Sequence, residues 1–432
     1  MKSKSNSLYG LPEKVKHCSQ CLMTNQKPHS VNETHNKSSN HKTGMTIHND
    51  GLCDACHYSK KKKKSINWKE REDMLLSRLE KFRRNDGRYD CIVSGSGGKD
   101  SMMVSHLLKY KYDMHPLTVT AAPLLYSDEG WNNMQNWIHT GGFDNVLYSP
   151  GGRVSSILSK EALKNIYHPI QPFKFGLKQF AVKMALRFGI DLVMYGEPWT
   201  EYGSATLDAV DSPAFDANLY CNNSSDIYIA GTHINDIMKT HKLCMNDLYP
   251  YLPIRSVELE KQNIIIENLG WYIQWDPQQA YYYAVDNCGF EPDSQRTDGT
   301  YGKYAGIDDK FESLHYYCHY IKFGIGRTRF DASQEVRNGH ISREEAIALA
   351  QKYEGEFPSR HHKDCLDFMK ITEEEFLRYT DKARSPHLWK HVDDKWIPWQ
   401  EIPELLQYYC KDIDPALLKK SGIKLNKEVV AA

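Results

Sequence analysis

Residues 96–101, with the sequence SGGKDS, form a run whose residue types are suited to holding an anion. The apolar residues 91–93 precede it and are typical of a buried parallel strand. Its glycines allow left-handed backbone angles and a close approach of the chain to a ligand. Ser101 is expected to cap a following helix, whose free N–H groups would point into the turn. The pattern predicts a strand, a phosphate-binding turn and a helix.

The spacing of this run excludes two common phosphate loops. A Walker A loop requires GxxxxGK[ST], but Asp100 follows Lys99, and Val93 stands five positions before Gly98. A GxGxxG loop fails because Asp100 occupies its third glycine position. SGGKDS instead resembles the SGGxDS signature of the PP-loop ATP pyrophosphatases. That resemblance implies that the run binds the pyrophosphate of ATP with Mg²⁺, through Ser94, Ser96, Gly97, Gly98, Lys99, Asp100 and Ser101.

Apolar patterns on either side of the loop alternate between strand and helix. Residues 116–120, 145–148 and 191–195 are expected to be further strands, and 173–188 a long amphipathic helix. This alternation predicts a Rossmann-like α/β fold, a parallel sheet with helices on both faces. Glu197 and Glu201 directly follow one strand, at the sheet edge where ligands bind, so both are candidates for holding Mg²⁺ or substrate. Residues 270–275 are expected to form the last strand.

Four cysteines near the start of the chain have the spacing of a metal site. They form two C-x-x-C pairs, Cys18 with Cys21 and Cys53 with Cys56. Two such pairs supply the four thiolates of a tetrahedral Zn²⁺, and the metal would fold a segment too polar to form its own core. An iron–sulfur cluster is the second interpretation. The five lysines at 60–64 are interpreted as a solvated linker.

Composition limits the classes of protein that this chain can belong to. It has 432 residues, with 55 Lys and Arg against 55 Asp and Glu, so no overall charge would draw it to nucleic acid. The first residues are basic but lack the apolar core of a secretory signal. No apolar run approaches the roughly 18 residues of a membrane span. These features predict a cytoplasmic protein without a membrane span.

Three domains are expected. They are a zinc module with its linker (1–64), an ATP-binding domain (65–276) and a helical C-terminal domain for substrate or partner (277–432). The segment 204–246 is interpreted as an insertion, such as a lid. Residues 296–310 are polar and glycine-punctuated, which favours substrate contacts by Arg296, Thr300, Tyr301, Lys303, Asp308 and Lys310.

Taken together and in this order, the motifs resemble those of the N-acetyl sugar amidotransferases of the WbpG and PseA type. They are the cysteine pairs, SGGKDS, YGEPWTEYG at 195–203, WDP at 275–277, TDGTYGKY at 297–304, IDDK at 307–310, IKFGIGR at 321–327 and REE at 343–345. The resemblance implies conversion of an acetamido group on a bacterial surface sugar to an acetamidino group. In that chemistry ATP adenylylates the amide oxygen, and ammonia then displaces AMP. Catalytic roles would fall to Lys99, Asp100, Glu197 and Glu201.

The source of ammonia is expected to be a separate glutaminase subunit or free ammonium. Position 2 is Lys rather than Cys, and no cysteine lies in a GxCxG elbow. The nearest rival interpretation is a PP-loop tRNA-modifying enzyme of the thiolation type. It predicts a catalytic cysteine pair near the loop and a basic face.

Overall fold

A computed structural model describes residues 7–30, 36–39, 41–203, 212–214 and 220–425. Its centre is a five-stranded sheet in the order β3-β2-β1-β4-β7, with every neighbouring pair parallel. The strands are β1 (Cys91–Ser94), β2 (Pro116–Ala121), β3 (Asn145–Tyr148), β4 (Leu192–Tyr195) and β7 (Ile265–Asn268). The four strands expected from 91–93, 116–120, 145–148 and 191–195 are confirmed.

Both faces of the sheet are covered, because successive side chains of each strand point to opposite sides. Cys91 and Val93 enter one apolar core, whereas Ile92 between them enters another. Helices that contribute to the first core are α2 (Trp68–Leu79), α3 (Lys99–His106), α4 (Asp128–His139), α10 (Leu269–Tyr272) and α11 (Pro277–Cys288). The opposite face is covered by α6 (Gln171–Phe188) and α9 (Ser256–Lys261). The predicted α/β class is confirmed.

The last strand of the sheet lies earlier than expected. It is β7, whereas residues 269–272 form the helical turn α10 and Trp275 is fully buried behind it. A β-carbon at Gly270 would lie 2.8 Å from the carbonyl oxygen of Gly196. The prediction of a strand at 270–275 was therefore wrong: the aromatic residues there pack the core around a close backbone contact.

The lysine run is a helix rather than a solvated linker. It forms the second half of α1 (Asp54–Lys64), and Lys62 is only 2% exposed while Lys60, Lys61, Lys63 and Lys64 are exposed. The linker interpretation is thus wrong at Lys62. The proposed domain boundaries at 64 and 276 remain predictions.

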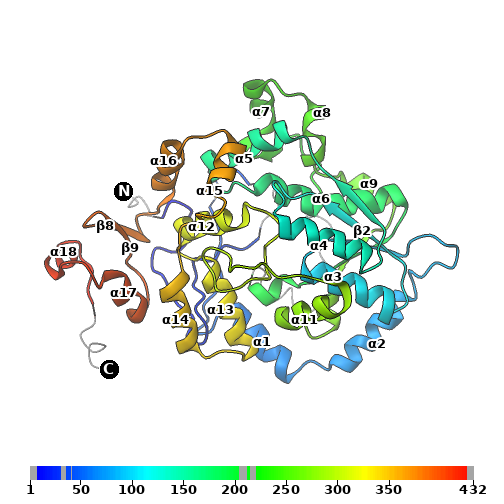
Figure 1. Cartoon of the computed structure of the whole chain (residues 1–432), viewed down its shortest axis with the longest axis horizontal. Helices are drawn as coiled ribbons and strands as arrows, with labels where there is room; N and C mark the ends of the chain where they lie inside the picture. Colours follow the sequence, from blue (N-terminus) through cyan, green and yellow to red (C-terminus); the bar gives the residue numbers. More distant parts are fainter. Residues whose placement is uncertain (1–6, 31–35, 40, 204–211, 215–219, 426–432) are drawn as a thin grey trace.

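The part of the chain after residue 277 is mainly helical, as expected, with one added hairpin. Its helices after α11 are α12 (Glu312–Phe323), α13 (Arg327–Asn338), α14 (Arg343–Tyr353), α15 (His362–Met369), α16 (Glu373–Ala383), α17 (Pro403–Cys410) and α18 (Pro415–Lys420). The antiparallel hairpin consists of β8 (Trp389–Val392) and β9 (Lys395–Pro398). Figure 1 shows this hairpin at the end of the molecule opposite α2.

Eight further elements complete the described part of the chain. They are η2 (Leu107–Lys111), α5 (Gly152–Ile166), η3 (Trp199–Tyr202), β5 (Tyr228–Ile229), β6 (Thr232–His233), α7 (Ile234–His241), α8 (Met245–Leu248) and η6 (Tyr249–Tyr251). Among them, α5, α7 and α8 contribute to a separate apolar core. Of the segment expected to be a lid, residues 204–211 and 215–219 lie outside the described residues, and the described remainder includes β5, β6 and α7. Its role as a lid remains a prediction. Within the described ranges, no helix has both the length and the apolar character that crossing a membrane requires.

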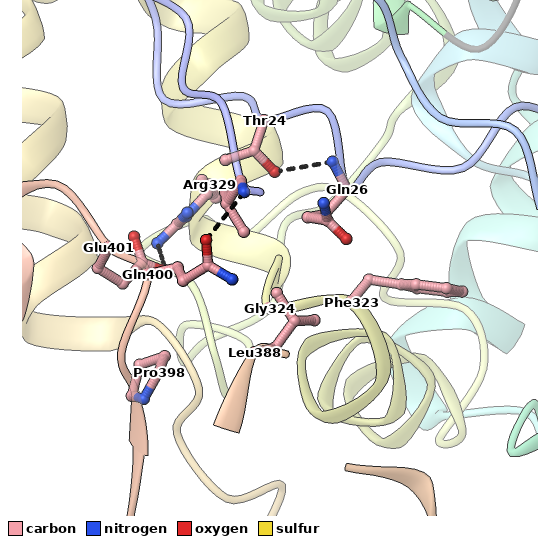
Figure 2. Close-up of a pocket in the computed structure, with 10 residues that line it drawn as sticks. Thr24, Gln26, Phe323, Gly324, Arg329, Leu388, Pro398, Gln400 and Glu401 are labelled. Atoms are coloured by element: carbon pink, nitrogen blue, oxygen red, sulfur yellow. Dashed lines mark hydrogen bonds and ion pairs between the residues drawn. The ribbon is translucent and has the colours of Figure 1, made fainter. Parts of the chain in front are cut away.

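The N-terminal segment, residues 13–26, is hydrogen-bonded to Gln400 in the C-terminal part of the chain. The Val15 N–H donates to the Gln400 side chain at 3.0 Å, and the Gln400 amide donates to the Glu13 carbonyl at 2.7 Å. Figure 2 shows Thr24 and Gln26 of this segment facing Arg329, Gln400 and Glu401 across a small cavity. Its volume of about 10 Å³ is at the limit for one water molecule, so this contact is a packed interface.

Candidate active site

The predicted phosphate loop joins β1, the central strand, to the N-terminus of α3. Gly97 has φ +84°, and a β-carbon there would lie 2.7 Å from the Met134 backbone of α4. Only glycine satisfies both conditions. Gly98 is the N-cap of α3, and a β-carbon on it would meet no atom within 4 Å. The loop is therefore packed on one side and open on the other.

Ser101 does not cap this helix. Its hydroxyl donates to the Gly98 carbonyl at 2.9 Å, and α3 begins at Lys99 without a side-chain cap. The capping prediction was wrong because Ser101 lies inside the first turn, where its hydroxyl reaches back to the carbonyl before it. As a result, the first N–H groups of α3 have no side-chain cap and are available to an anion.

A large cavity lies at the carboxyl ends of β1 and β4. The order of the sheet reverses between these strands, since the chain passes from β1 to β2 and β3 before returning to β4, and ligands bind at such switch points. Its volume is about 1050 Å³. Gly98, Lys99 and Asp100 line one side, and residues 300–306 with α13 line another. The phosphate loop and the segment 296–310 therefore meet at a single cavity.

Lys99 and Asp100 form a contact within the loop itself. Lys99 Nζ lies 2.7 Å and 2.6 Å from the two carboxylate oxygens of Asp100, and the Lys99 side chain is only 5% exposed. The Tyr304 ring lies beneath the ammonium, 6.0 Å from Nζ to the ring centroid. A pyrophosphate or a cation entering the cavity would thus find both charges beside the open face of Gly98.

Glu197 also lines the cavity, as its position after β4 predicted. The Tyr202 hydroxyl donates to its carboxylate. Burial, followed by the neighbouring Asp100 charge, raises the pKa of Glu197 from 4.5 to about 7. Two carboxylates beside one phosphate loop supply the oxygen ligands that Mg²⁺ prefers, so Asp100 and Glu197 fit a magnesium ion.

Glu201 has a different role from Glu197. Its carboxylate accepts hydrogen bonds from Lys62 Nζ at 2.7 Å and 3.0 Å, and its side chain is only 3% exposed. Lys62 also donates to the Trp275 carbonyl at 2.9 Å. The expectation that Glu201 faces the cavity beside Glu197 is not met, because η3 turns its side chain toward α1.

The residues expected to contact substrate divide into two groups. Thr300, Tyr301 and Lys303 line the cavity, and the Tyr301 hydroxyl is buried without a hydrogen-bond partner among the described residues. Arg296 instead pairs with Glu356 at 2.6 Å, and Lys310 with Asp364 at 2.8 Å.

Asp308 is held through its backbone. Its carbonyl accepts the Ser127 N–H at 3.2 Å, at the N-cap of α4. The structure therefore gives Arg296, Asp308 and Lys310 contacts that support the segment 296–310 rather than places on the cavity wall.

Several cavity residues were not predicted from the sequence. Arg327, Asp331 and Glu335 lie on one face of α13 at a spacing of four residues, and all three line the cavity. Asp331 accepts the Thr300 hydroxyl at 2.6 Å and pairs with Arg327 at 3.0 Å. The sequence signal for these residues was a charged side chain at every fourth position after Gly324 and Gly326, a spacing that places them on one face of a helix.

The four cysteines come together as predicted. All are buried, and their sulfur atoms lie within 4.8 Å of one another, with Cys18–Cys56 and Cys21–Cys53 each at 3.7 Å. Four thiol ligands this close fit a single tetrahedral metal ion. Ile325, Phe330 and Val336 from the C-terminal part pack against them.

A family comparison bears on the C-terminal side of the cavity. Residues 298–412 match the family model of the LPS biosynthesis protein WbpG-like, C-terminal domain. This part of the chain is similar to that WbpG-like domain. It supplies the cavity wall from Thr300 to Ile341, opposite the phosphate loop. The resemblance to the WbpG type is confirmed for this domain.

Three solved structures are similar to parts of the chain at low identity. NMN synthetase from Francisella tularensis matches at 14% identity over 30% of this chain and 54% of its own, about half its length, with a TM-score of 0.23. NH3-dependent NAD synthetase from Campylobacter jejuni matches at 11% identity over 46% and 85%, with a TM-score of 0.25. U34-tRNA thiolase NcsA from Methanococcus maripaludis matches at 11% identity over 84% and 88%, with a TM-score of 0.31. Among curated proteins, none matches this sequence.

Proposed function

We propose that this protein is an ATP-dependent N-acetyl sugar amidotransferase that converts an acetamido group of a bacterial surface sugar to an acetamidino group. The observation that carries the proposal is the shared cavity. An SGGKDS loop forms one of its walls, and a WbpG-like domain forms another. The acceptor is a nucleotide-linked diacetamido sugar or a nonulosonic acid, of the kind used in O-antigen or flagellin glycosylation.

The chemistry proposed for this cavity has two steps. An amide is a poor electrophile, so its oxygen first attacks the α-phosphorus of ATP, and pyrophosphate leaves. Ammonia then adds to the activated carbon and AMP departs with the former amide oxygen, while one ammonia proton is released. The product carries a C–N bond where the amide had its C–O bond.

The residues at the phosphate loop are suited to the first step. The buried Lys99 ammonium and the uncapped N–H groups of α3 would stabilise the negative charge of the departing pyrophosphate. Mg²⁺ would be held by Asp100 and Glu197, and when bound it neutralises phosphate charge. Asp100 would then exchange its present bonds to Lys99 for the ion, which frees the ammonium for the phosphate oxygens.

The four-cysteine site is proposed to hold Zn²⁺. Zn–S bonds of about 2.3 Å in a tetrahedron place sulfur atoms about 3.8 Å apart, close to the 3.7 Å of two of the pairs here. A [4Fe–4S] cluster binds the four thiolates to four different iron atoms and therefore needs more widely spaced sulfurs. The four cysteines are buried against Phe330 and Val336 of α13 and do not line the active cavity, so the proposed role of this metal is structural.

Ammonia is proposed to come from a separate glutaminase or from free ammonium. Of the eleven cysteines, Cys244 alone is exposed, and it lies at the N-cap of the short helix α8. None of the described residues that line the active cavity is a cysteine. This arrangement also weighs against the thiolation alternative, which requires reactive cysteines beside the loop.

Pyrophosphate release tests the proposal. The protein is incubated with ATP, Mg²⁺, ammonium and an acetamido sugar acceptor, and AMP, pyrophosphate and the sugar are quantified by mass spectrometry. The expected product is one mass unit lighter than the acceptor, because NH replaces O. AMP formation that requires tRNA and not a sugar would refute the amidotransferase and favour the thiolation alternative.

A further inference from the structure

The helix α13 forms a wall of the active cavity that the proposed ATP chemistry does not use. Arg327, Asp331, Gln334 and Glu335 recur along this helix at the spacing of one face, and all four line the cavity. Residues 98–100 of the phosphate loop line the same cavity and are assigned to the phosphates of ATP. The α13 wall is therefore available to the sugar substrate.

The carboxamide of Gln334 lies in this wall without a partner among the described residues. Gln334 is only 7% exposed, and its Nε2 is buried and makes no hydrogen bond to any described residue. Such a nitrogen is normally paired, because burying it without a hydrogen bond is costly. Nε2 can only donate, so its ligand must offer an acceptor. The Tyr301 hydroxyl, buried at the same cavity and likewise without a described partner, is a second donor.

The charges beside Gln334 favour an uncharged acceptor over an anion. Asp331 and Glu335 place two carboxylates on the same wall. The Arg327 guanidinium is engaged with acidic side chains, at 3.0 Å from Asp331 and 3.6 Å from Glu312. A phosphate or carboxylate bound to Gln334 would be repelled by the two carboxylates of the wall. The oxygen that accepts from Gln334 is therefore that of a neutral group.

Side chains near Gln334 in sequence match the other parts of an acetamido group. Glu335 Oε2 lies 2.5 Å from His340 Nδ1. A carboxylate has about four acceptor positions, so Glu335 can accept an amide N–H as well. Phe330 and Ile341 line the same cavity and supply apolar surface for a methyl group. A carbonyl oxygen, an N–H and a methyl group together make an acetamido group, whereas a sugar hydroxyl has no methyl group.

An amide held by Gln334 is not suited to be the amide that reacts. In the proposed chemistry the oxygen of the reacting amide attacks the α-phosphorus of ATP, whose pyrophosphate lies at the phosphate loop. An oxygen that accepts a hydrogen bond from Gln334 loses electron density to the donor and becomes a weaker nucleophile. The group held by α13 is therefore a second acetamido group of the same sugar.

We propose that Gln334 is a specificity-determining residue that binds the non-reacting acetamido group of a diacetamido sugar. Its Nε2 donates to the carbonyl oxygen, Glu335 accepts the amide N–H, and Phe330 packs against the methyl group. This assignment rests on the proposed amidotransferase function. It adds that the enzyme recognises its sugar through two acetamido groups, of which one is converted.

Two analogues of a UDP-linked diacetamido hexose, each with a hydroxyl in place of one acetamido group, test the assignment. The analogue that keeps the reacting group should still give AMP, with a KM about tenfold higher, because a hydrogen bond and the burial of a methyl group are lost. The other analogue should bind as a competitive inhibitor. If the unmodified protein turns over a diacetamido nonulosonic acid instead, the corresponding analogues of that sugar are used.

Gln334→Leu tests the residue itself. It should raise the KM for the diacetamido sugar about three- to tenfold, the effect of one neutral hydrogen bond. The KM for ATP and the KM for the analogue without the second acetamido group should not change. Gln295→Leu, at an exposed glutamine, is the matched control and should change none of these values. If Gln334→Leu does not fold, the unmodified protein decides alone, and equal KM values for the diacetamido sugar and that analogue would overturn the assignment.

The outcomes separate this assignment from the function on which it rests. A preference for the diacetamido sugar that is the same in Gln334→Leu as in the unmodified protein would overturn the assignment and leave the amidotransferase function standing. A rise in the KM for ATP in place of the KM for the sugar would put Gln334 at the nucleotide and overturn it too. If no acetamido sugar gives AMP with ATP and ammonium, the proposed function is wrong, and the assignment falls with it.

Discussion

Lys62 and Glu201 form a buried ion pair that joins the cysteine-bearing helix α1 to the segment after β4. Lys62 Nζ lies 2.7 Å from Glu201 Oε1, and the side chains are 2% and 3% exposed. Burial raises the pKa of Glu201, and the Lys62 charge opposes that rise. Tyr202 follows Glu201 in the chain, and its hydroxyl donates a hydrogen bond to Glu197 in the cavity. The ion pair therefore supports the active cavity and is a good target for mutation.

Lys62→Met should destabilise the protein by about 3–5 kcal/mol, since it leaves a buried carboxylate without its partner. Urea unfolding followed by circular dichroism measures the loss. Lys64→Met, at an exposed lysine of the same helix, is the matched control and should change stability little. The double variant Lys62→Met with Glu201→Leu should recover part of the loss. An unfolding midpoint for Lys62→Met equal to that of the unmodified protein would contradict this role.

Activity should depend on the ionisation of Glu197, whose pKa is raised to about 7 by burial and by Asp100. Its carboxylate is the form proposed to hold Mg²⁺, so kcat/KM should fall about tenfold for each pH unit below that value. The pH profile of AMP formation measures this. Glu197→Gln should be much less active and should lack this dependence. The same profile in Glu197→Gln as in the unmodified protein would assign it to another group.

The free energy of unfolding should change with pH in the direction opposite to activity, because Glu197 titrates in the folded protein. The raised pKa means that the folded protein holds the proton more tightly than the unfolded chain. The stabilisation is present below the ordinary pKa of 4.5 and is lost as pH rises through about 7. Glu197→Gln should therefore gain stability relative to the unmodified protein between pH 5 and pH 8 or so. Asp309, whose pKa is also raised to about 7, titrates in both proteins and cancels in this comparison.

Asp100→Asn should abolish pyrophosphate release while leaving the zinc content of the protein unchanged. Asp100 lies in the first turn of α3, at the cavity, whereas the four cysteines lie outside this helix and do not line the cavity. Parallel assays of pyrophosphate and of bound metal separate the two sites. Retained turnover would remove Asp100 from the mechanism.

Tyr301→Phe should raise the KM for the acceptor about three- to tenfold, the effect of one neutral hydrogen bond. The hydroxyl is buried at the cavity without a described partner, so its removal should cost little stability. Tyr282→Phe, at a tyrosine that is 56% exposed, serves as the control. A KM for the acceptor unchanged by Tyr301→Phe would exclude a substrate bond to that hydroxyl.

Cys56→Ser should reduce bound metal and lower the thermal unfolding temperature, because the site loses one of four thiolates. Elemental analysis should find about one zinc per chain in the unmodified protein. Cys244→Ser, at the exposed cysteine, should retain the metal. Iron with sulfide in place of zinc would show that the site holds a cluster.

The sequence by itself determined the features that depend on neighbours along the chain. The apolar runs indicated the first four strands, and for β1, β2 and β4 the reason is that a strand buried on both faces needs consecutive apolar residues. The edge strand β3 is only partly buried. The glycine spacing indicated the phosphate loop, and the C-x-x-C pairs indicated the thiolate site, since both chemistries are local. Glu197 was found in the same way, from its place directly after β4.

Tertiary structure alone decided which charged residues are free for chemistry. Lys62 and Glu201 are 139 positions apart, and Arg296 and Glu356 are 60 apart, so no local pattern shows that they pair. The same holds for the cavity of about 170 Å³ beside His168 and His315, whose lining residues come from segments distant in sequence. A charged side chain in a sequence has many possible partners, and the fold fixes one of them by the cost of burying a charge unpaired.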